Sequence, residues 1–214
     1  MVSLSRKFTS ALSLLIFCSI TLSGLSQSET SKWKFQLAFG VNFPENTGLV
    51  NPYEPKSVNF PSINLGIQHM FKGDLGAKLD FGYNRFTNTD GTPEFKTNYT
   101  RLNAQLVYDP TEKISFLPPH FGVVAHIGPG ITFMKPLGSF TENKQTYVNL
   151  LGGLELHYGI TQTVSIYTDL SYIYALAGDK TYDPPQEGFG AFRGNLFTVS
   201  LGVSVSLSGC QYCD

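Results

Sequence analysis

The sequence has little charge, and the few charges that it has nearly cancel. Charged residues make up only 14% of the 214 positions, and the formal net charge is -1 at pH 7. A soluble domain usually carries about a quarter charged residues, so this composition is not typical of a water-solvated surface. There is also no basic stripe or strong net field to attract nucleic acid, and we exclude that class of partner.

Long hydrophobic runs are lacking as well, except near the N-terminus. Arg6 and Lys7 precede an apolar stretch from Ala11 to Leu22, and small residues follow up to Ser26. The stretch is shorter than the roughly 20 apolar residues that a membrane-spanning helix needs. This order predicts a secretory signal peptide over residues 1–26, cleaved after Ser26. The alternatives are an uncleaved anchor and a buried N-terminal strand.

Apolar and polar residues alternate with period two along the rest of the chain. In residues 197–207, Phe, Val and Leu share one face while Ser, Thr and Gly share the other, and residues 33–42 alternate in the same way. A strand places successive side chains on opposite faces, whereas a helix would scatter each set. Each segment is about ten residues long, as a tilted transmembrane strand requires. Six further segments follow the pattern, near residues 62–71, 75–84, 101–108, 121–133, 148–158 and 164–174.

The links between these segments alternate in length. The shorter links are residues 72–74, 109–120 and 159–163, and the long ones are 43–60, 85–98, 134–145 and 175–194. Short turns at one rim and long loops at the other are typical of outer-membrane barrels, whose long loops face outside the cell. We therefore expect extracellular long loops and periplasmic termini.

A soluble, lipocalin-like barrel is the main rival, because it shows the same alternation with the apolar face inward. Two observations oppose it. The polar faces carry Gly, Ser, Asn, Thr and Gln rather than the many charges of a soluble exterior. Aromatic residues also gather near the strand ends, where membrane interfaces lie; these are Trp33, Phe71, Tyr83, Tyr108, Phe133, Tyr158, Tyr174 and Phe197. The predicted fold class is all-β, an eight-stranded antiparallel up-and-down transmembrane β-barrel over residues 27–207.

Together with these features, the final segment Asn195-Leu-Phe-Thr-Val-Ser-Leu-Gly-Val-Ser-Val205 resembles the small OmpA-type outer-membrane β-barrels. The resemblance covers about residues 31–207. It implies insertion by the β-barrel assembly machinery and a structural or surface role. The chain departs from the family where a short periplasmic tail, residues 208–214, follows the last strand. It also leaves no room for a peptidoglycan-binding domain, so we do not expect cell-wall anchoring.

Ionisable residues on the polar faces are the candidate functional residues. An unpaired charge inside a narrow barrel is costly, so these residues must be paired or hydrated. Three bases face three acids, with two histidines, His126 and His157, besides. We predict an ion-pair network that plugs the lumen, in which Arg101 reaches Asp80; the alternative is an active site or an ion path. The predicted network is Lys34, Lys78, Asp80, Arg101, Glu155 and Asp169.

These features predict a non-enzymatic outer-membrane protein with a structural or surface-interaction role. The expected partners are membrane lipid and an unidentified loop ligand. The alternatives are a narrow porin-like channel and, less favoured, a lipid-A-modifying enzyme. Such an enzyme would need a Ser, a His and a carboxylate on the lipid-facing side, where His69 is the only outward histidine. We expect no catalytic, cofactor or metal residues.

Two smaller motifs remain. Cys210 and Cys213 form a C-x-x-C in the tail, and we interpret them as a disulfide in the oxidising periplasm or as a simple tail. Pro129, between two glycines, has no N–H to donate to a strand ladder. It therefore predicts a β-bulge or the end of regular pairing.

Overall fold

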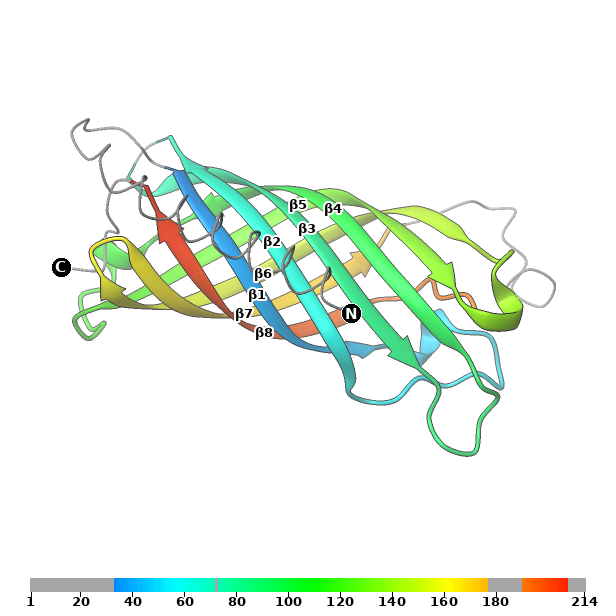
Figure 1. Ribbon diagram of the computed structural model, residues 1–214. Helices are drawn as coiled ribbons and strands as arrows, with labels where there is room; N and C mark the ends of the chain where they lie inside the picture. The colour runs from blue at the N-terminus through cyan, green and yellow to red at the C-terminus, as the bar shows by residue number, and fades with distance from the viewer. Residues whose placement is uncertain (1–32, 72, 177–189, 208–214) are drawn as a thin grey trace, which may run out of the picture. The chain divides into compact units, whose positions relative to one another are not determined.

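Eight strands close into one antiparallel barrel (Figure 1). The computed structural model describes residues 33–71, 73–176 and 190–207. Neighbours in sequence are neighbours in the wall, and the last strand pairs with the first. The predicted fold class is confirmed; the predicted signal peptide and tail, with Cys210 and Cys213, lie outside the described residues. The strands are β1 (Trp33–Pro44), β2 (Asn59–Met70), β3 (Leu75–Thr87), β4 (Lys96–Tyr108), β5 (Phe121–Pro136), β6 (Gln145–Thr161), β7 (Val164–Ala175) and β8 (Leu196–Ser206).

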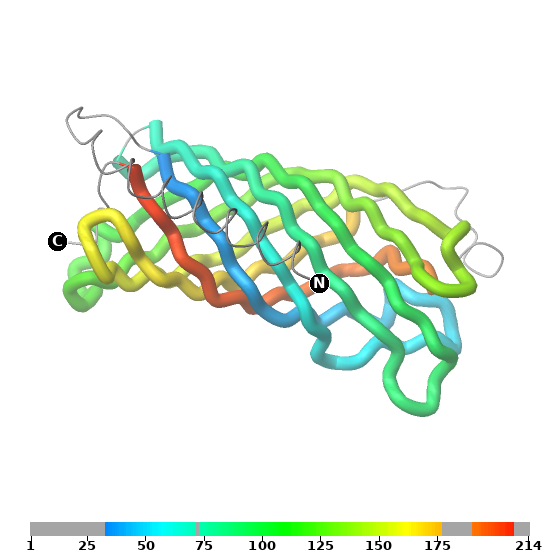
Figure 2. The backbone as a smooth tube through the Cα atoms, viewed as in Figure 1, coloured from blue at the N-terminus to red at the C-terminus, as the bar shows by residue number. Residues whose placement is uncertain are grey.

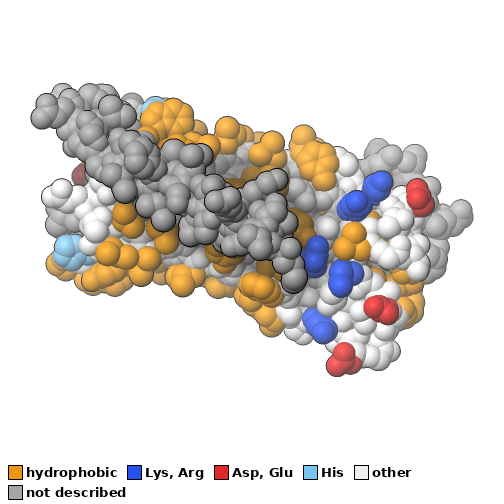
Figure 3. All heavy atoms as spheres, viewed as in Figure 1, with side chains coloured by type: hydrophobic (Ala, Val, Ile, Leu, Met, Phe, Trp, Pro, Cys, Tyr) orange, Lys and Arg blue, Asp and Glu red, His pale blue; other side chains and the backbone are white. Residues whose placement is uncertain are grey.

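The wall of the barrel is apolar outside and polar inside. On β8, Leu201 is 64% exposed, while its neighbours Ser200 and Gly202 are buried. The other strands alternate in the same sense, and Figure 3 shows apolar side chains covering much of the wall. A soluble barrel would have the opposite arrangement, because water disfavours a continuous apolar exterior. The observed faces are those of a barrel that spans a bilayer.

The two rims differ in how they connect the strands, as the tube in Figure 2 shows. Of the described residues, the short-turn rim carries 71, 73–74, 109–120 and 162–163; the long-loop rim carries 45–58, 88–95, 137–144, 176 and 190–195. The described parts of these links hold three 3₁₀ turns: η2 (Asn46–Gly48), η3 (Thr111–Lys113) and η4 (Gly138–Phe140). Within the described ranges, no helix has both the length and the apolarity to cross a bilayer.

The strands run further into the long-loop rim than the sequence predicts. β3 continues to Thr87 and β4 begins at Lys96, so the loop between them is residues 88–95 rather than 85–98. The alternation also continues, because Phe86 and Tyr99 are buried inside the barrel. These inward residues are apolar, so the strand ends do not follow the rule of polar residues inside and apolar residues outside. A prediction based on that rule therefore ends the strands too early.

Pro129 interrupts one ladder without a bulge. The β4–β5 register passes from Asn103 opposite Gly130 to Leu106 opposite Ile127, and no shift occurs between these pairs. The intervening residues lack ladder pairs with β4, whereas Pro129 still pairs with Leu150 on β6. The expected loss of regular pairing is therefore seen on one side only, and the expected bulge is wrong. The missing N–H of proline leaves a gap in the ladder while the flanking residues hold the register.

Candidate functional site

The six ionisable residues that the sequence predicts to form a network lie together in the lumen. All six are buried, because each occupies the inward phase of its strand. They come from five strands: Lys34 on β1, Lys78 and Asp80 on β3, Arg101 on β4, Glu155 on β6 and Asp169 on β7. The site is thus assembled by side chains that cross the barrel from several walls.

Glu155 is the centre of one group of contacts. Lys78 Nζ lies 2.6 Å from Glu155 Oε1, and this ion pair crosses the lumen from β3 to β6. The other oxygen, Oε2, accepts a hydrogen bond from Gln36 Nε2 at 2.8 Å and contacts His157 Nε2 at 2.7 Å. Both carboxylate oxygens are therefore occupied by donors from three strands.

Arg101 is the centre of a second group. Its guanidinium forms an ion pair with Asp80 on the adjacent strand. Arg101 Nη2 also donates to Asn64 Oδ1 at 2.9 Å, and Nη1 donates to Asn103 Oδ1 at 3.2 Å. Gly82 makes room for this side chain, since a Cβ there would lie 2.5 Å from Arg101 Nε. The guanidinium is fully buried and held by three strands.

His126 links the Arg101 group to Asp169. Gln105 Nε2 donates to Asp80 Oδ2 at 3.3 Å, which turns Gln105 Oε1 toward His126 Nδ1, 2.6 Å away. On the other side of the ring, His126 Nε2 lies 3.5 Å from Asp169 Oδ1. Asp169 also accepts a hydrogen bond from Ser171 Oγ at 2.5 Å. The polar contacts therefore continue from β3 around the interior to β7.

Lys34 lies nearest the short-turn rim, where sequence reasoning missed a further acid. Lys34 is attracted by the negative charges of Asp109 and Glu155. Asp109 follows β4 directly and is only 1% exposed, although the sequence analysis assigned it to a turn. Its Oδ1 accepts hydrogen bonds from the backbone N and the Oγ1 of Thr111. Within the described residues, four buried acids thus face three buried bases.

One group in the lumen has donor atoms suited to a metal ion. His126, Glu155 and Asp169 each offer a ligand atom, and these atoms lie within 4.8 Å of one another. Glu155, however, already accepts Lys78 on one oxygen and Gln36 on the other. A cation at this point would have to displace one of those donors, so the contacts favour a network of side chains.

An apolar cluster lies toward each rim of the lumen. A small cluster of Met70, Val107 and Val124 lies toward the short-turn rim. A larger cluster, which we call the mouth cluster, lies toward the long-loop rim and combines inward strand residues with loop residues. Its members are Phe86, Phe95, Tyr99, Met134, Tyr147, Leu151, Ile173, Ala191, Phe192 and Leu196.

Phe192 is a loop residue at the centre of the ring contacts in the mouth cluster. It is fully buried, and its ring centroid lies 4.9 Å from that of Phe86 and 6.2 Å from that of Tyr99. The segment around it is fixed by Thr97 Oγ1, which donates to the Gly190 carbonyl at 2.8 Å. No period-two pattern marks residue 192, so sequence reasoning missed it.

Backbones meet closely beside Phe192. The backbone N of Arg193 donates to the Gly48 carbonyl at 2.8 Å, which joins the segment before β8 to the first long loop. A Cβ on Gly48 would lie 2.6 Å from Gly194 Cα. Glycine is therefore required where these two loops cross the barrel mouth.

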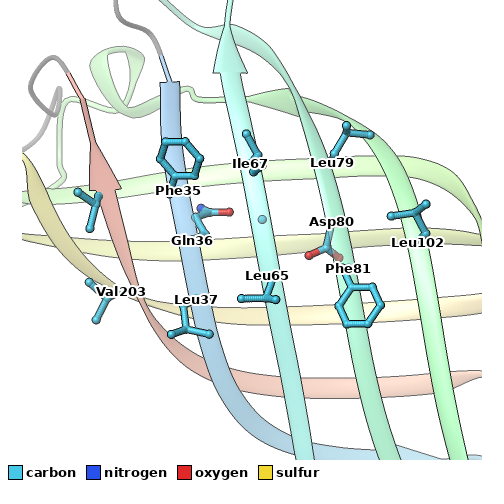
Figure 4. A pocket seen from close by; sticks show the side chains of 12 residues that line it. Phe35, Gln36, Leu37, Leu65, Ile67, Leu79, Asp80, Phe81, Leu102 and Val203 are labelled. Carbon is cyan, nitrogen blue, oxygen red and sulfur yellow. The ribbon is translucent and has the colours of Figure 1, made fainter. Parts of the chain in front are cut away.

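A groove of about 620 Å³ lies on the outer wall rather than in the lumen (Figure 4). Outward apolar side chains such as Leu65, Leu79 and Phe81 line it. Gly66 lies in register between Gln36 and Asp80, and a Cβ on it would point into the lumen, 2.9 Å from Gln36 Oε1. This groove faces the surroundings of the barrel.

The comparisons with known proteins identify the fold. Neisserial surface protein A superposes with a TM-score of 0.59 at 13% identity, covering 84% of this chain and 99% of that one. The outer membrane protein OprG from Pseudomonas aeruginosa gives 0.54 at 12% identity, covering 85% and 99%. A major outer membrane protein from Thermus thermophilus gives 0.52 at 12% identity, covering 81% and 98%.

No family model and no curated protein matches the sequence. At identities this low, the structural likeness shows the fold alone. The chain therefore has the fold of the small eight-stranded outer-membrane barrels, and its particular role must be argued from its own residues.

Proposed function

We propose that this protein is a non-enzymatic integral outer-membrane barrel with a closed lumen. Its role is structural or consists of surface interactions through the long loops. The supporting observation is the series of buried contacts that fill the lumen, from the Lys78–Glu155 ion pair through the Arg101 group to the mouth cluster. A channel needs a hydrated path. Here such a path would have to pass two buried ion pairs and an apolar seal.

The proposed orientation places the long-loop rim outside the cell and the termini in the periplasm. Long extracellular loops and short periplasmic turns are the rule for such barrels. The β-barrel assembly machinery would then be the partner for insertion. Protease added to intact cells should cut within the long loop of residues 45–58 and spare residues 71–74. Cleavage only at the short turns would reverse the orientation.

Conductance measurements test the closed lumen. The purified barrel, inserted into planar lipid bilayers, is expected to show no steady ion current. Its insertion is checked by the faster migration of the unheated protein in detergent gels. A steady current from a correctly inserted barrel would favour the porin-like channel. A freely soluble protein without heat-dependent migration would contradict the membrane barrel itself.

The absence of an enzymatic role is part of the proposal. The outward-facing His69 pairs in register with Trp33 and Ala77, and neither can serve as a nucleophile or as a carboxylate partner. Its ring packs against Trp33 at 4.5 Å and Phe71 at 5.4 Å between centroids. Mass spectrometry of lipid A from cells with and without the gene is expected to give identical species, and a gene-dependent change would establish a lipid-modifying enzyme.

A further inference from the structure

Four cations gather at the long-loop rim on one side of the barrel. Arg85 on β3 and Lys135 on β5 both stand opposite Asn98 on β4, and Lys96 lies two residues away from Asn98 on β4. Lys56 joins them from the first long loop, where its backbone N bonds to the end of β3. Figure 3 shows Lys and Arg side chains gathering where the apolar wall ends. We call Lys56, Arg85, Lys96 and Lys135 the basic row.

The charges of the basic row are not neutralised within the described residues. No ion pair within 4.0 Å joins any of its members to a carboxylate. Arg85 Nε donates to Asn98 Oδ1 at 2.8 Å, and the guanidinium carbon lies 5.8 Å from the centroid of the Tyr83 ring. These contacts position Arg85 and leave its positive charge available. The acids of the neighbouring loops, Glu54, Asp90 and Glu94, are exposed and lie beyond the strand ends.

The row is confined to one side of the rim. The outward faces of β1, β7 and β8, as the structure describes them, carry no Lys or Arg. At that rim Glu45 instead accepts hydrogen bonds from Tyr172 OH at 2.7 Å and Asn195 Nδ2 at 2.9 Å. An anionic ligand would therefore be drawn to the β3–β5 side.

The wall below the row is apolar over the depth of one leaflet. On the outward face of β3, Arg85 is followed by Tyr83, Phe81 and Leu79, and the last two line the groove near Gly66. Arg85 and Leu79 lie about 20 Å apart along the strand at ~3.3 Å per residue. With a strand tilt of about 40° this is a depth of about 15 Å. That depth is half of a hydrocarbon core of about 30 Å.

We propose that this wall binds a phosphorylated lipid of the leaflet at the long-loop rim. The phosphates bind to the basic row, and the acyl chains run along Phe81 and Leu79 into the groove. Arg pairs with phosphate through two parallel hydrogen bonds, and Lys binds it as a point charge. The inference rests on the proposed outer-membrane function and orientation, because the outer leaflet then supplies a lipid with phosphates on a sugar head group.

Lipid titration of the purified barrel in neutral detergent tests this inference. The probes are lipid A with two phosphates and the same lipid without phosphates, and native mass spectrometry measures their affinities. The wild type is expected to prefer the phosphorylated lipid. Each cation near a membrane surface contributes roughly fivefold in affinity, so the triple variant Arg85→Gln/Lys96→Gln/Lys135→Gln should lose roughly a hundredfold. Equal affinity for the two lipids, or an unchanged triple variant, would overturn the proposal.

Two further variants separate charge from chain contacts. Lys113→Gln removes one exposed cation at the opposite rim and is expected to leave the affinity unchanged; a loss as large as that of Arg85→Gln would mean that only net charge matters. Leu79→Trp fills part of the groove and should weaken both lipids equally, and no effect would contradict the acyl-chain placement. Heat-dependent migration checks that every variant folds. A wild type that does not migrate as a barrel contradicts the proposed function, whereas a correctly folded barrel without phosphate preference contradicts only this inference.

Discussion

The polar middle of the lumen and the apolar mouth are packed by different means. In the middle, charged side chains fixed on strands meet across the axis, as Lys78 and Glu155 do. At the mouth, Phe192 enters from the segment before β8 and packs on strand residues. The middle depends on ion pairs held by a rigid wall, while the mouth depends on a loop contact that can detach without opening the wall.

This difference suggests separate roles for the two regions in the stability of the barrel and in access to its lumen. Breaking a buried ion pair leaves an uncompensated charge in a dry interior, which is a large and global cost. Removing a loop side chain loses packing at one end only, and local openings of this kind have lower free energies than global unfolding. We therefore expect the middle to determine unfolding and the mouth to determine access to the lumen.

Arg101→Ala is expected to have the largest effect. It leaves Asp80 buried without its cation, and the free energy of unfolding should fall by about 3–5 kcal/mol. Urea unfolding in detergent micelles, followed by the heat-dependent gel shift, measures it. Lys144→Ala in an exposed loop is the control. Equal stability of the two variants would show that the network does not hold the barrel.

A double-mutant cycle on Lys78 and Glu155 tests whether these two residues stabilise the barrel as a pair. Lys78→Met and Glu155→Leu should each cost about 3–5 kcal/mol, because each leaves one buried charge. The double variant removes both charges and should be more stable than either single variant. Additive losses in the same unfolding assay would mean that the two residues do not form a coupled pair.

Phe192→Ala tests the mouth. The loss of packing should lower the free energy of unfolding by about 2–3 kcal/mol. This is less than the loss expected for a Phe enclosed in a rigid core, because the loop can relax around the gap. Hydrogen exchange should quicken at the rim end of β4, near Thr97 and Tyr99, and stay slow around Glu155. Uniform acceleration throughout the barrel would contradict the separation of mouth and middle.

The smallest effect is expected at the exposed pair of Lys113 and Asp74 on the short-turn rim, where Nζ lies 2.6 Å from Oδ2. The hydrogen bond to Asp74 raises the pKa of Lys113 above its ordinary value of 10.5. A raised lysine pKa stabilises the fold below that ordinary value, and the contribution is lost as the pH rises through the folded-state pKa. Exposed pairs are screened, so Asp74→Asn should leave unfolding at neutral pH unchanged. Urea midpoints from pH 7 to 11 measure this, and a large difference at pH 7 would contradict it.

The strands and their faces could be predicted from sequence because period two fixes which side chain points inward. That pattern placed Lys78, Arg101 and Glu155 in the lumen. It could not pair Lys78 with Glu155, since contacts across the axis depend on the relative heights of strands that are not adjacent. The burial of Asp109 and Phe192 could not be predicted, because both residues lie outside the strands, where no periodicity applies.

The contacts of Glu155 also constrain the order in which the barrel assembles. Its donors Gln36 and Lys78 are separated from it by 119 and 77 residues along the chain. An open sheet holds these groups apart, so water must solvate each charge until the first and last strands join. Closure of the wall and dehydration of the interior are then a single cooperative event. A partly closed sheet would remain wet inside, and it has no stable resting state within the hydrocarbon.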